Sequence, residues 1–275
     1  MDFPAELRGF LTTRRARLTP DQAGVPKFSG VRRVPGLRRE EVAHLAGVSV
    51  DYYTRLERGR VAGASREVLD AVARALRLGE DERDHFLSLV AAIQRTRPER
   101  PAGRPVVRPE LRRVLDALAT PAFIQNDRLD FLYANRLGRA VFSLQPGEPF
   151  NTLRFQLLDP RARDFYLDWE GATHNGVAVL RASAGRDPGD QHIARLVDEL
   201  SARSDYFRAL WASHDVLRYR RGAKRYRHPL AGELTFDYES FRVNDDPALT
   251  MLVYTAEPGS RTARALTFLA SDGAP

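Results

Sequence analysis

The residues of this chain with the plainest chemistry lie between Ser49 and Arg60. Ser49 can accept hydrogen bonds from the free N–H groups that begin a helix. Arg55 carries a planar guanidinium, which can donate two parallel hydrogen bonds to a flat edge with two acceptors. Both belong to one exposed polar face, which also contains Val50, Asp51 and Tyr52 and is followed by Arg58 and Arg60. Such a face recognises a partner and makes no covalent bond.

Residues for bond-making chemistry are scattered or missing. The six histidines share no H-x-x-x-H spacing and there is no Cys, so neither a zinc site nor a thiol nucleophile is predicted. The sequence has no G-x-x-x-x-G-K-[ST] loop, G-x-S-x-G elbow or G-x-G-x-x-G turn. Asp168 and Glu170 are two residues apart, so on a helix they point in different directions. We therefore expect no enzyme activity, no metal and no cofactor.

Two short helices must position this polar face, and both lie between Leu37 and Gly59. Apolar residues recur at helical spacing before Gly47 and again after it, which predicts one shared buried seam: Val42, Leu45 and Ala46, then Val50, Tyr53 and Leu56. Gly47 suits the positive φ of a tight turn between the helices.

The segment resembles the helix-turn-helix of the lambda-repressor-like (XRE) family. The EVAHLAGVS run, the Tyr52-Tyr53 pair and the RLERG ending carry the resemblance. It implies that the second helix lies in the major groove of DNA, where Arg55 reaches a base edge and Tyr52 contacts a phosphate. Tyr53 is expected in the core, and Glu57 is an alternative structural partner for a neighbouring arginine. An ordinary helical hairpin would not need Gly47, a cap and a basic exterior together.

The positive charge is concentrated in the half of the chain that contains this segment. The net charge is +7. Residues 1–109 hold 21 Arg and Lys against 14 Asp and Glu, whereas residues 110–275 hold 22 against 22. A GC-rich genome would also produce many arginines, but the asymmetry favours a polyanionic partner. We expect further DNA-backbone contacts from Arg32, Arg33, Arg38 and Arg39.

Helical patterns fill residues 1–95 and predict a compact five-helix DNA-binding domain. A first helix runs from Phe3 to about Leu18, and a Pro- and Gly-rich connection follows. Ser65 is expected to cap a fourth helix, and Glu80 begins a fifth. Residues 96–109 lack apolar periodicity and are rich in Pro and Arg, so they are predicted to be a linker stiffened by proline.

Residues 110–275 predict an α+β domain with one antiparallel sheet. A helix is expected over Glu110–Ala119, followed by paired strands at 121–125 and 129–134 and by a helix capped by Asn135. Several helical pieces follow from Asp159. Three strands within 216–229, 232–243 and 249–259 and a last helix over Arg261–Ala270 complete the domain.

This second domain resembles the ligand-binding domain of MmyB-like transcription regulators. The similarity lies in PAFIQNDRLDFLYANRLGRAVF, NTLRFQLLDPRARDFYLDWE, LWASHDV and YTAEPGS, spread over residues 105–270. It implies a PAS-like fold that senses a small hydrophobic molecule, with fatty acids as a candidate class, in a pocket between sheet and helices.

Candidate ligand residues are large aromatics and a few polar groups that could orient a ligand. The aromatic candidates are Phe123, Tyr133, Phe142, Phe155, Trp169 and Trp211, and the polar ones are Asn135, Asn151, Arg154 and His214. For each aromatic, plain hydrophobic core is the alternative. Arg154 could pair with a ligand carboxylate or with a nearby aspartate.

Together these patterns predict a cytoplasmic, ligand-responsive regulator that binds double-stranded DNA as a homodimer on an inverted repeat. The N-terminus lacks a signal peptide and no stretch is apolar enough to span a membrane, so no membrane partner is expected. The alternative is a DNA-bound recruitment module whose C-terminal domain docks a protein partner instead of a small effector.

Overall fold

The computed structural model describes residues 2–25, 34–94, 106–187, 189–218, 221–244 and 246–271. Its contacts divide the chain into two compact units. Unit 1 comprises residues 1–100, 181–194 and 209–217, and unit 2 comprises residues 101–180, 195–208 and 218–275. Two segments of the C-terminal half therefore pack with the N-terminal domain.

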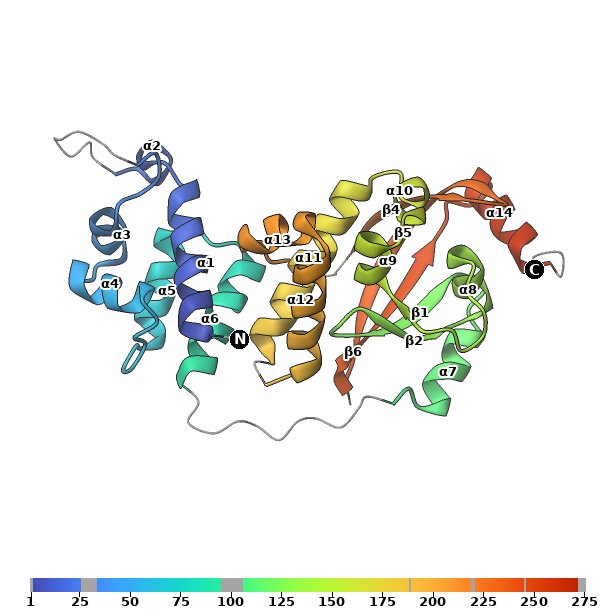
Figure 1. The fold of residues 1–275 in the computed structure, drawn as a ribbon, viewed down its shortest axis with the longest axis horizontal. Coiled ribbons are helices and arrows are strands. Elements are labelled where there is room, and N and C mark those ends of the chain that lie inside the picture. Colours follow the sequence, from blue (N-terminus) through green and yellow to red (C-terminus); the bar gives the residue numbers. More distant parts are fainter. Residues whose placement is uncertain are drawn as a thin grey trace. The chain divides into compact units, whose positions relative to one another are not determined.

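The N-terminal part of unit 1 is helical, as predicted. Its helices are α1 (Phe3–Arg17), α2 (Pro20–Ala23), α3 (Arg39–Ala46), α4 (Val50–Glu57), α5 (Arg66–Ala75) and α6 (Glu80–Gln94) (Figure 1). Helix α2 was not predicted, because its four residues show no periodicity. Reciprocal hydrogen bonds between Thr19 and Gln22 hold it in place.

The turn between α3 and α4 has the predicted geometry. Gly47 has φ +66°, and the Ser49 hydroxyl accepts from the Tyr52 N–H at 3.1 Å. Val42 is fully buried, but Leu45 is 36% exposed, so its predicted place in the seam is wrong. The buried side of α3 is centred between Val42, Ala43 and Ala46. Leu45 lies about 100° away from that centre at 100° per residue.

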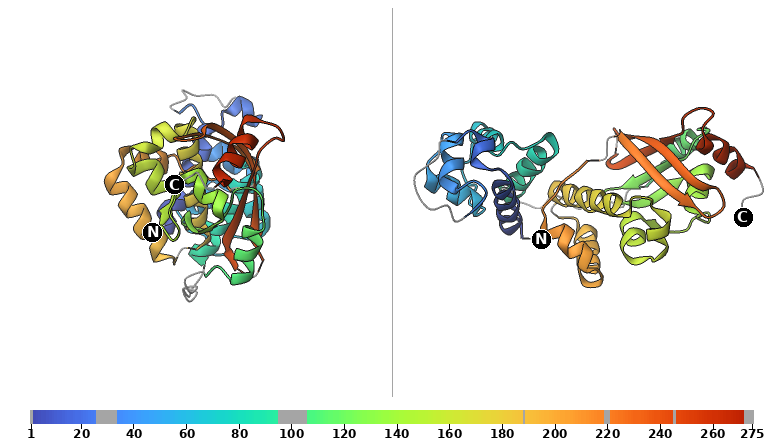
Figure 2. Two further views of the ribbon diagram at one scale, coloured as in Figure 1. Left: turned by 90° about the vertical axis from the view of Figure 1, so that its right-hand side faces the viewer. Right: turned by 90° about the horizontal axis from the view of Figure 1, so that it is seen from above.

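Unit 2 contains one antiparallel sheet with the strand order β3-β2-β1-β6-β5-β4. The strands are β1 (Ala122–Asn126), β2 (Asp130–Ala134), β3 (Phe150–Asn151), β4 (Arg221–His228), β5 (Gly232–Val243) and β6 (Asp246–Thr255). Five of them were predicted, and β3 is too short to give a pattern. The long strands twist visibly in Figure 2.

Helices lie before, between and after these strands along the chain. They are α7 (Pro109–Asp116), α8 (Arg136–Phe142), α9 (Thr152–Leu158), α10 (Arg161–Phe165), α11 (Trp169–Arg186), α12 (Gln191–Arg203), α13 (Asp205–Ala212) and α14 (Arg261–Ala270). Neighbours on β1 point to opposite faces: Phe123 joins the core formed with α8 and α10, whereas Ile124 joins the core formed with α7. The predicted fold class, a helix-turn-helix bundle followed by an α+β domain, is confirmed.

Candidate functional site

Helix α4 presents the predicted polar face to solvent. Ser49, Asp51 and Arg55 are exposed. Val50 is 46% exposed, so it belongs to this face and its predicted place in the buried seam is wrong. The Arg55 guanidinium lies 5.9 Å from the centre of the Tyr52 ring. The DNA major groove is wide enough to admit an α-helix. An arginine on the outer side of such a helix can then reach the base edges.

The opposite side of α4 is anchored in the bundle. Tyr53 is fully buried, as predicted, and burial raises the pKa of its hydroxyl. Glu57, at the end of α4, is 1% exposed. Its carboxylate accepts from Thr12 Oγ1 at 2.9 Å, Arg15 Nη2 at 3.2 Å and Arg39 Nε at 2.8 Å.

The three donors decide the charge state of Glu57. Burial alone would raise the pKa of this carboxyl, but hydrogen bonds from Arg39 and Thr12 and the charge of Arg15 lower it below its usual value. Glu57 is thus a buried anion that joins α4 to α1. Arg39, predicted as a DNA contact, is the neighbouring arginine that binds it, although 43% of the Arg39 side chain stays exposed.

Further basic residues lie around α4. Arg58 and Arg60 follow the helix and are exposed. Arg38 precedes α3 and forms a 3.3 Å ion pair with Glu40 at the surface. Arg32 and Arg33 fall outside the described residues. The described arginines form a basic border that suits contact with a phosphate backbone.

Unit 2 contains a half-open hollow of about 1430 Å³. Phe131 and Phe150 come to it from paired strands, Phe142 from α8, Phe155 from α9 and Phe165 from α10. These phenylalanines form a closed ring, in which successive ring centres along 131-150-155-165-142-131 lie 4.9, 5.4, 5.6, 5.4 and 5.4 Å apart. We call this group the phenylalanine ring.

Arginines outnumber carboxylates around the hollow. Its lining includes Arg112, Arg128, Arg139, Arg154, Arg161, Arg203 and Arg227, against Asp130, Glu148, Asp159 and Asp164. The hollow thus combines an apolar floor with an arginine-rich rim, although several of these arginines are paired with carboxylates.

Arg154 forms a close ion pair with a residue that is distant in sequence. Its Nε and Nη2 donate to the Glu199 carboxylate on α12 at 3.0 and 2.7 Å, and this hydrogen bonding raises the pKa of Arg154. Asn151 accepts from the Arg154 backbone N–H at 2.9 Å and so begins α9. The predicted partner of Arg154, a nearby aspartate, differs from the observed Glu199, because no local pattern shows that α12 lies beside α9.

Half of the predicted ligand residues line the hollow, namely Tyr133, Phe142, Asn151, Arg154 and Phe155. The other half have different places. Phe123 is fully buried in the core beside the phenylalanine ring. Asn135 is 2% exposed, accepts from the N–H groups of Ala122 and Gly138, and donates to backbone carbonyls, so it is a structural cap.

Trp169, Trp211 and His214 are also absent from the lining. Trp169 donates its indole N–H to the Gln156 carbonyl at 2.7 Å and stacks on Tyr206 at 4.8 Å. Trp211 and His214 belong to unit 1. Their position within residues 110–275 predicts a place with the ligand residues, but the structure differs: Trp211 contacts Arg181 of α11, and His214 contacts α1 and Arg181.

The structure adds Phe131, Phe150 and Phe165 to the site. Phe131 lies two residues before Tyr133 on β2, but the pairing of β1 with β2 shifts register between Ile124 and Gln125. Phe131 therefore packs in the core with Phe123, whereas Tyr133 packs in the core with Ile124 on the other face, and simple alternation along the strand would not have found Phe131. Phe150 gives no such signal, since β3 has two residues. Among the described residues, no three His, Asp or Glu side chains gather as metal ligands would, and no helix is long and apolar enough to cross a bilayer.

Unit 1 presents a helix-turn-helix with a basic border, and unit 2 contains an aromatic hollow with arginines at its rim. These features define the class: a DNA-binding protein that binds a ligand. Residues 6–86 match the model of a helix-turn-helix domain. Residues 107–269 match the MmyB-like transcription regulator ligand binding domain, and the chain belongs to this family. It is a ligand-responsive transcription regulator. A search among curated proteins finds no significant match.

Proposed function

We propose that the hollow of unit 2 binds a fatty-acid-like amphiphile and that unit 1 reads an inverted-repeat operator in the manner of XRE-type regulators. The observation that carries the ligand class is the phenylalanine ring with its surplus of rim arginines. Aromatic faces favour a hydrocarbon chain, and guanidinium groups favour an anionic head. At about 1430 Å³, the hollow exceeds the roughly 300–1,000 Å³ of ordinary ligand pockets, which leaves room for a long chain.

Palmitate is expected to bind the full chain, and Phe142→Ala to weaken this binding by about 10- to 100-fold, as loss of a buried aromatic contact costs about 1.5–3 kcal/mol. Isothermal titration with palmitate measures this. Phe268→Ala is the matched control, because Phe268 is 49% exposed on α14 and does not line the hollow. Hexadecanol, which lacks the charge, should bind more weakly; equal binding would contradict the role of the arginines.

Arg55→Ala is expected to relax base preference at one position of each half-site. A bidentate arginine–guanine contact contributes about 1–3 kcal/mol of discrimination, whereas non-specific affinity depends on phosphate contacts. Selection of genomic fragments by the purified protein, followed by titration of each variant on a selected fragment and on random DNA, measures both. Equal losses on the two DNAs would show that Arg55 contacts only the backbone.

The operator is proposed to be an inverted repeat because one such helix offers few base contacts, and proteins of this kind usually bind as twofold dimers to half-sites about one helical turn apart. The alternative function is recruitment of a protein by unit 2. Native mass spectrometry of the freshly purified chain distinguishes the two: a retained apolar ligand supports sensing, and a compact chain without one favours recruitment.

A further inference from the structure

Two segments of the ligand-binding family region are built into the DNA-binding unit. Residues 181–194 and 209–217 lie within the region 107–269 that matches the ligand-binding domain, yet they pack in unit 1 with residues 1–100. We call them the docking segments. They consist of the end of α11, the start of α12, the end of α13 and the residues after it.

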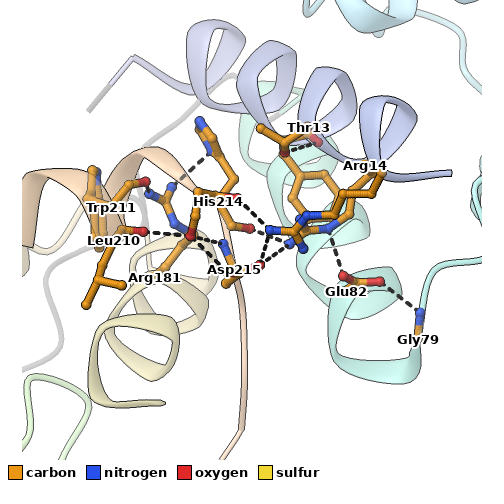
Figure 3. A network of polar contacts seen from close by, with 12 residues as sticks. Thr13, Arg14, Gly79, Glu82, Arg181, Leu210, Trp211, His214 and Asp215 are labelled. Carbon is orange, nitrogen blue, oxygen red and sulfur yellow. Dashed lines mark hydrogen bonds and ion pairs between the residues drawn. The ribbon is translucent and has the colours of Figure 1, made fainter. Parts of the chain in front are cut away.

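The docking segments make three contacts with the helices of the N-terminal domain. In the first, His214 lies directly against α1. A Cβ atom built at Gly9 would lie 2.3 Å from His214 Nε2, so only glycine leaves room for the imidazole. Arg14 donates to the His214 carbonyl (Figure 3). Arg17 Nη2 lies 2.6 Å from Asp215 Oδ1.

The second contact centres on Arg181, near the end of α11. Its side chain is 1% exposed. The guanidinium forms an ion pair with Glu6 of α1, donates to the Trp211 carbonyl and lies 4.0 Å from the centre of the Trp211 ring. His214 Nδ1 is 3.2 Å from both the Arg181 guanidinium and the Glu6 carboxylate, so one cluster joins both docking segments to α1.

The third contact is with α6. A Cβ atom built at Gly185 would lie 2.6 Å from His85 Nδ1, so the end of α11 fits against this buried histidine. The His85 ring meets Phe10 of α1 edge-on at 5.2 Å. On the same helix, Glu82 holds Arg14 Nε at 2.7 Å.

Charged side chains meet from both sides of these contacts. Three cations (Arg14, Arg17, Arg181) meet three anions (Glu6, Glu82, Asp215). Because a buried charge is costly to leave without its partner, the contact depends on these charged groups staying together.

Helix α12 belongs in part to the docking segments and in part to unit 2. Helix α12 supplies residues 191–194 to the docking segments and Glu199 to unit 2, where Glu199 pairs with Arg154. Arg154 lines the hollow. A ligand carboxylate that binds Arg154 would compete with Glu199, since both require the same guanidinium edge.

We propose that the docking segments are a ligand-controlled latch on α1: an anionic ligand takes Arg154 from Glu199, and the loss of this pair loosens α12 and releases the contact at Gly9. The proposal rests on the proposed function of the hollow and names its regulation. Release reaches the DNA-reading helix, because α1 also holds Glu57 of α4 through Thr12 and Arg15.

Gly9→Ala tests the docking contact in the full chain. Alanine is the better helix former, so α1 should remain folded while its methyl group displaces His214. Hydrogen exchange followed by mass spectrometry is expected to be at least tenfold faster over residues 209–217. Arg8→Ala, an exposed neighbour on α1, should leave exchange unchanged. Unchanged exchange in Gly9→Ala would overturn the docking contact.

Glu199→Gln tests the link to the hollow without a ligand. We expect at least fivefold faster exchange over residues 191–194 and 209–217, while Asp198→Asn, an exposed acid on the same helix, leaves it unchanged. Unchanged exchange in Glu199→Gln would overturn the link.

Palmitate is then added to the wild-type chain, with binding followed by calorimetry. Binding accompanied by the same faster exchange supports the latch, and binding without it overturns the latch. If palmitate does not bind, the proposed ligand class fails, and Glu199→Gln still decides the inference.

Discussion

Replacing Glu57 by alanine is expected to lower the free energy of unfolding of unit 1 by about 3–5 kcal/mol, the usual cost of removing one partner from a buried ion pair. The cost arises mainly at Arg15, whose side chain is 13% exposed and would lose its carboxylate partner. Arg39, at 43% exposed, can turn to water instead. Since domains of this size are stable by only about 5–15 kcal/mol, affinity for DNA should fall with the folded fraction.

Hydrogen exchange in urea, followed over α1 and α4 of the full chain, measures this loss. Glu40→Ala is the matched control, because Glu40 is a 54% exposed acid paired only at the surface, and its removal should cost less than about 0.5 kcal/mol. The loss of stability in Glu57→Gln should lie between those of the two alanine variants, because glutamine keeps a hydrogen-bond acceptor but not the negative charge. Equal stability of Glu57→Ala and Glu40→Ala would show that the buried pair contributes nothing.

The elements that sequence predicted well are those with local signals. Ser49, Ser65 and Asn135 each cap a helix as expected, because a cap depends on residues within one turn. The last helix has its predicted bounds, Arg261–Ala270. Helix α2 and strand β3 were missed because two to four residues cannot show a period.

The candidate site was predicted less completely, because it depends on contacts between distant residues. Phe142 and Phe155 line the hollow as predicted, whereas Phe150 reaches it only through the pairing of β3 with β2. The place of His214 depends on Gly9, which lies 205 positions earlier in the chain. Composition and periodicity cannot show such a contact.

Acidification is expected to weaken unit 1 through His214. Burial, then the charges of Arg181 and Arg14, lower the pKa of His214 from 6.5 to about 4. A base with a lowered folded-state pKa is protonated first in the unfolded state, so stability is unaffected at pH 7, falls as the pH drops below 6.5, and levels off below 4. The shift corresponds to about 3 kcal/mol, and because 16% of the side chain is exposed, we expect about 2–3 kcal/mol.

Other charges near His214 shift its pKa in both directions. Arg17 also lowers its pKa and Asp215 raises it, while the Glu6 carboxylate, 3.2 Å from Nδ1, is already shared with Arg181. The measurement is the urea midpoint at pH 7, 6 and 5, followed by Trp211 fluorescence in a Trp169→Phe chain, which leaves one tryptophan of two. His214→Gln should flatten the dependence on pH, and His44→Gln, on an exposed histidine, should not. Parallel curves for the two variants would assign the acid sensitivity to other groups.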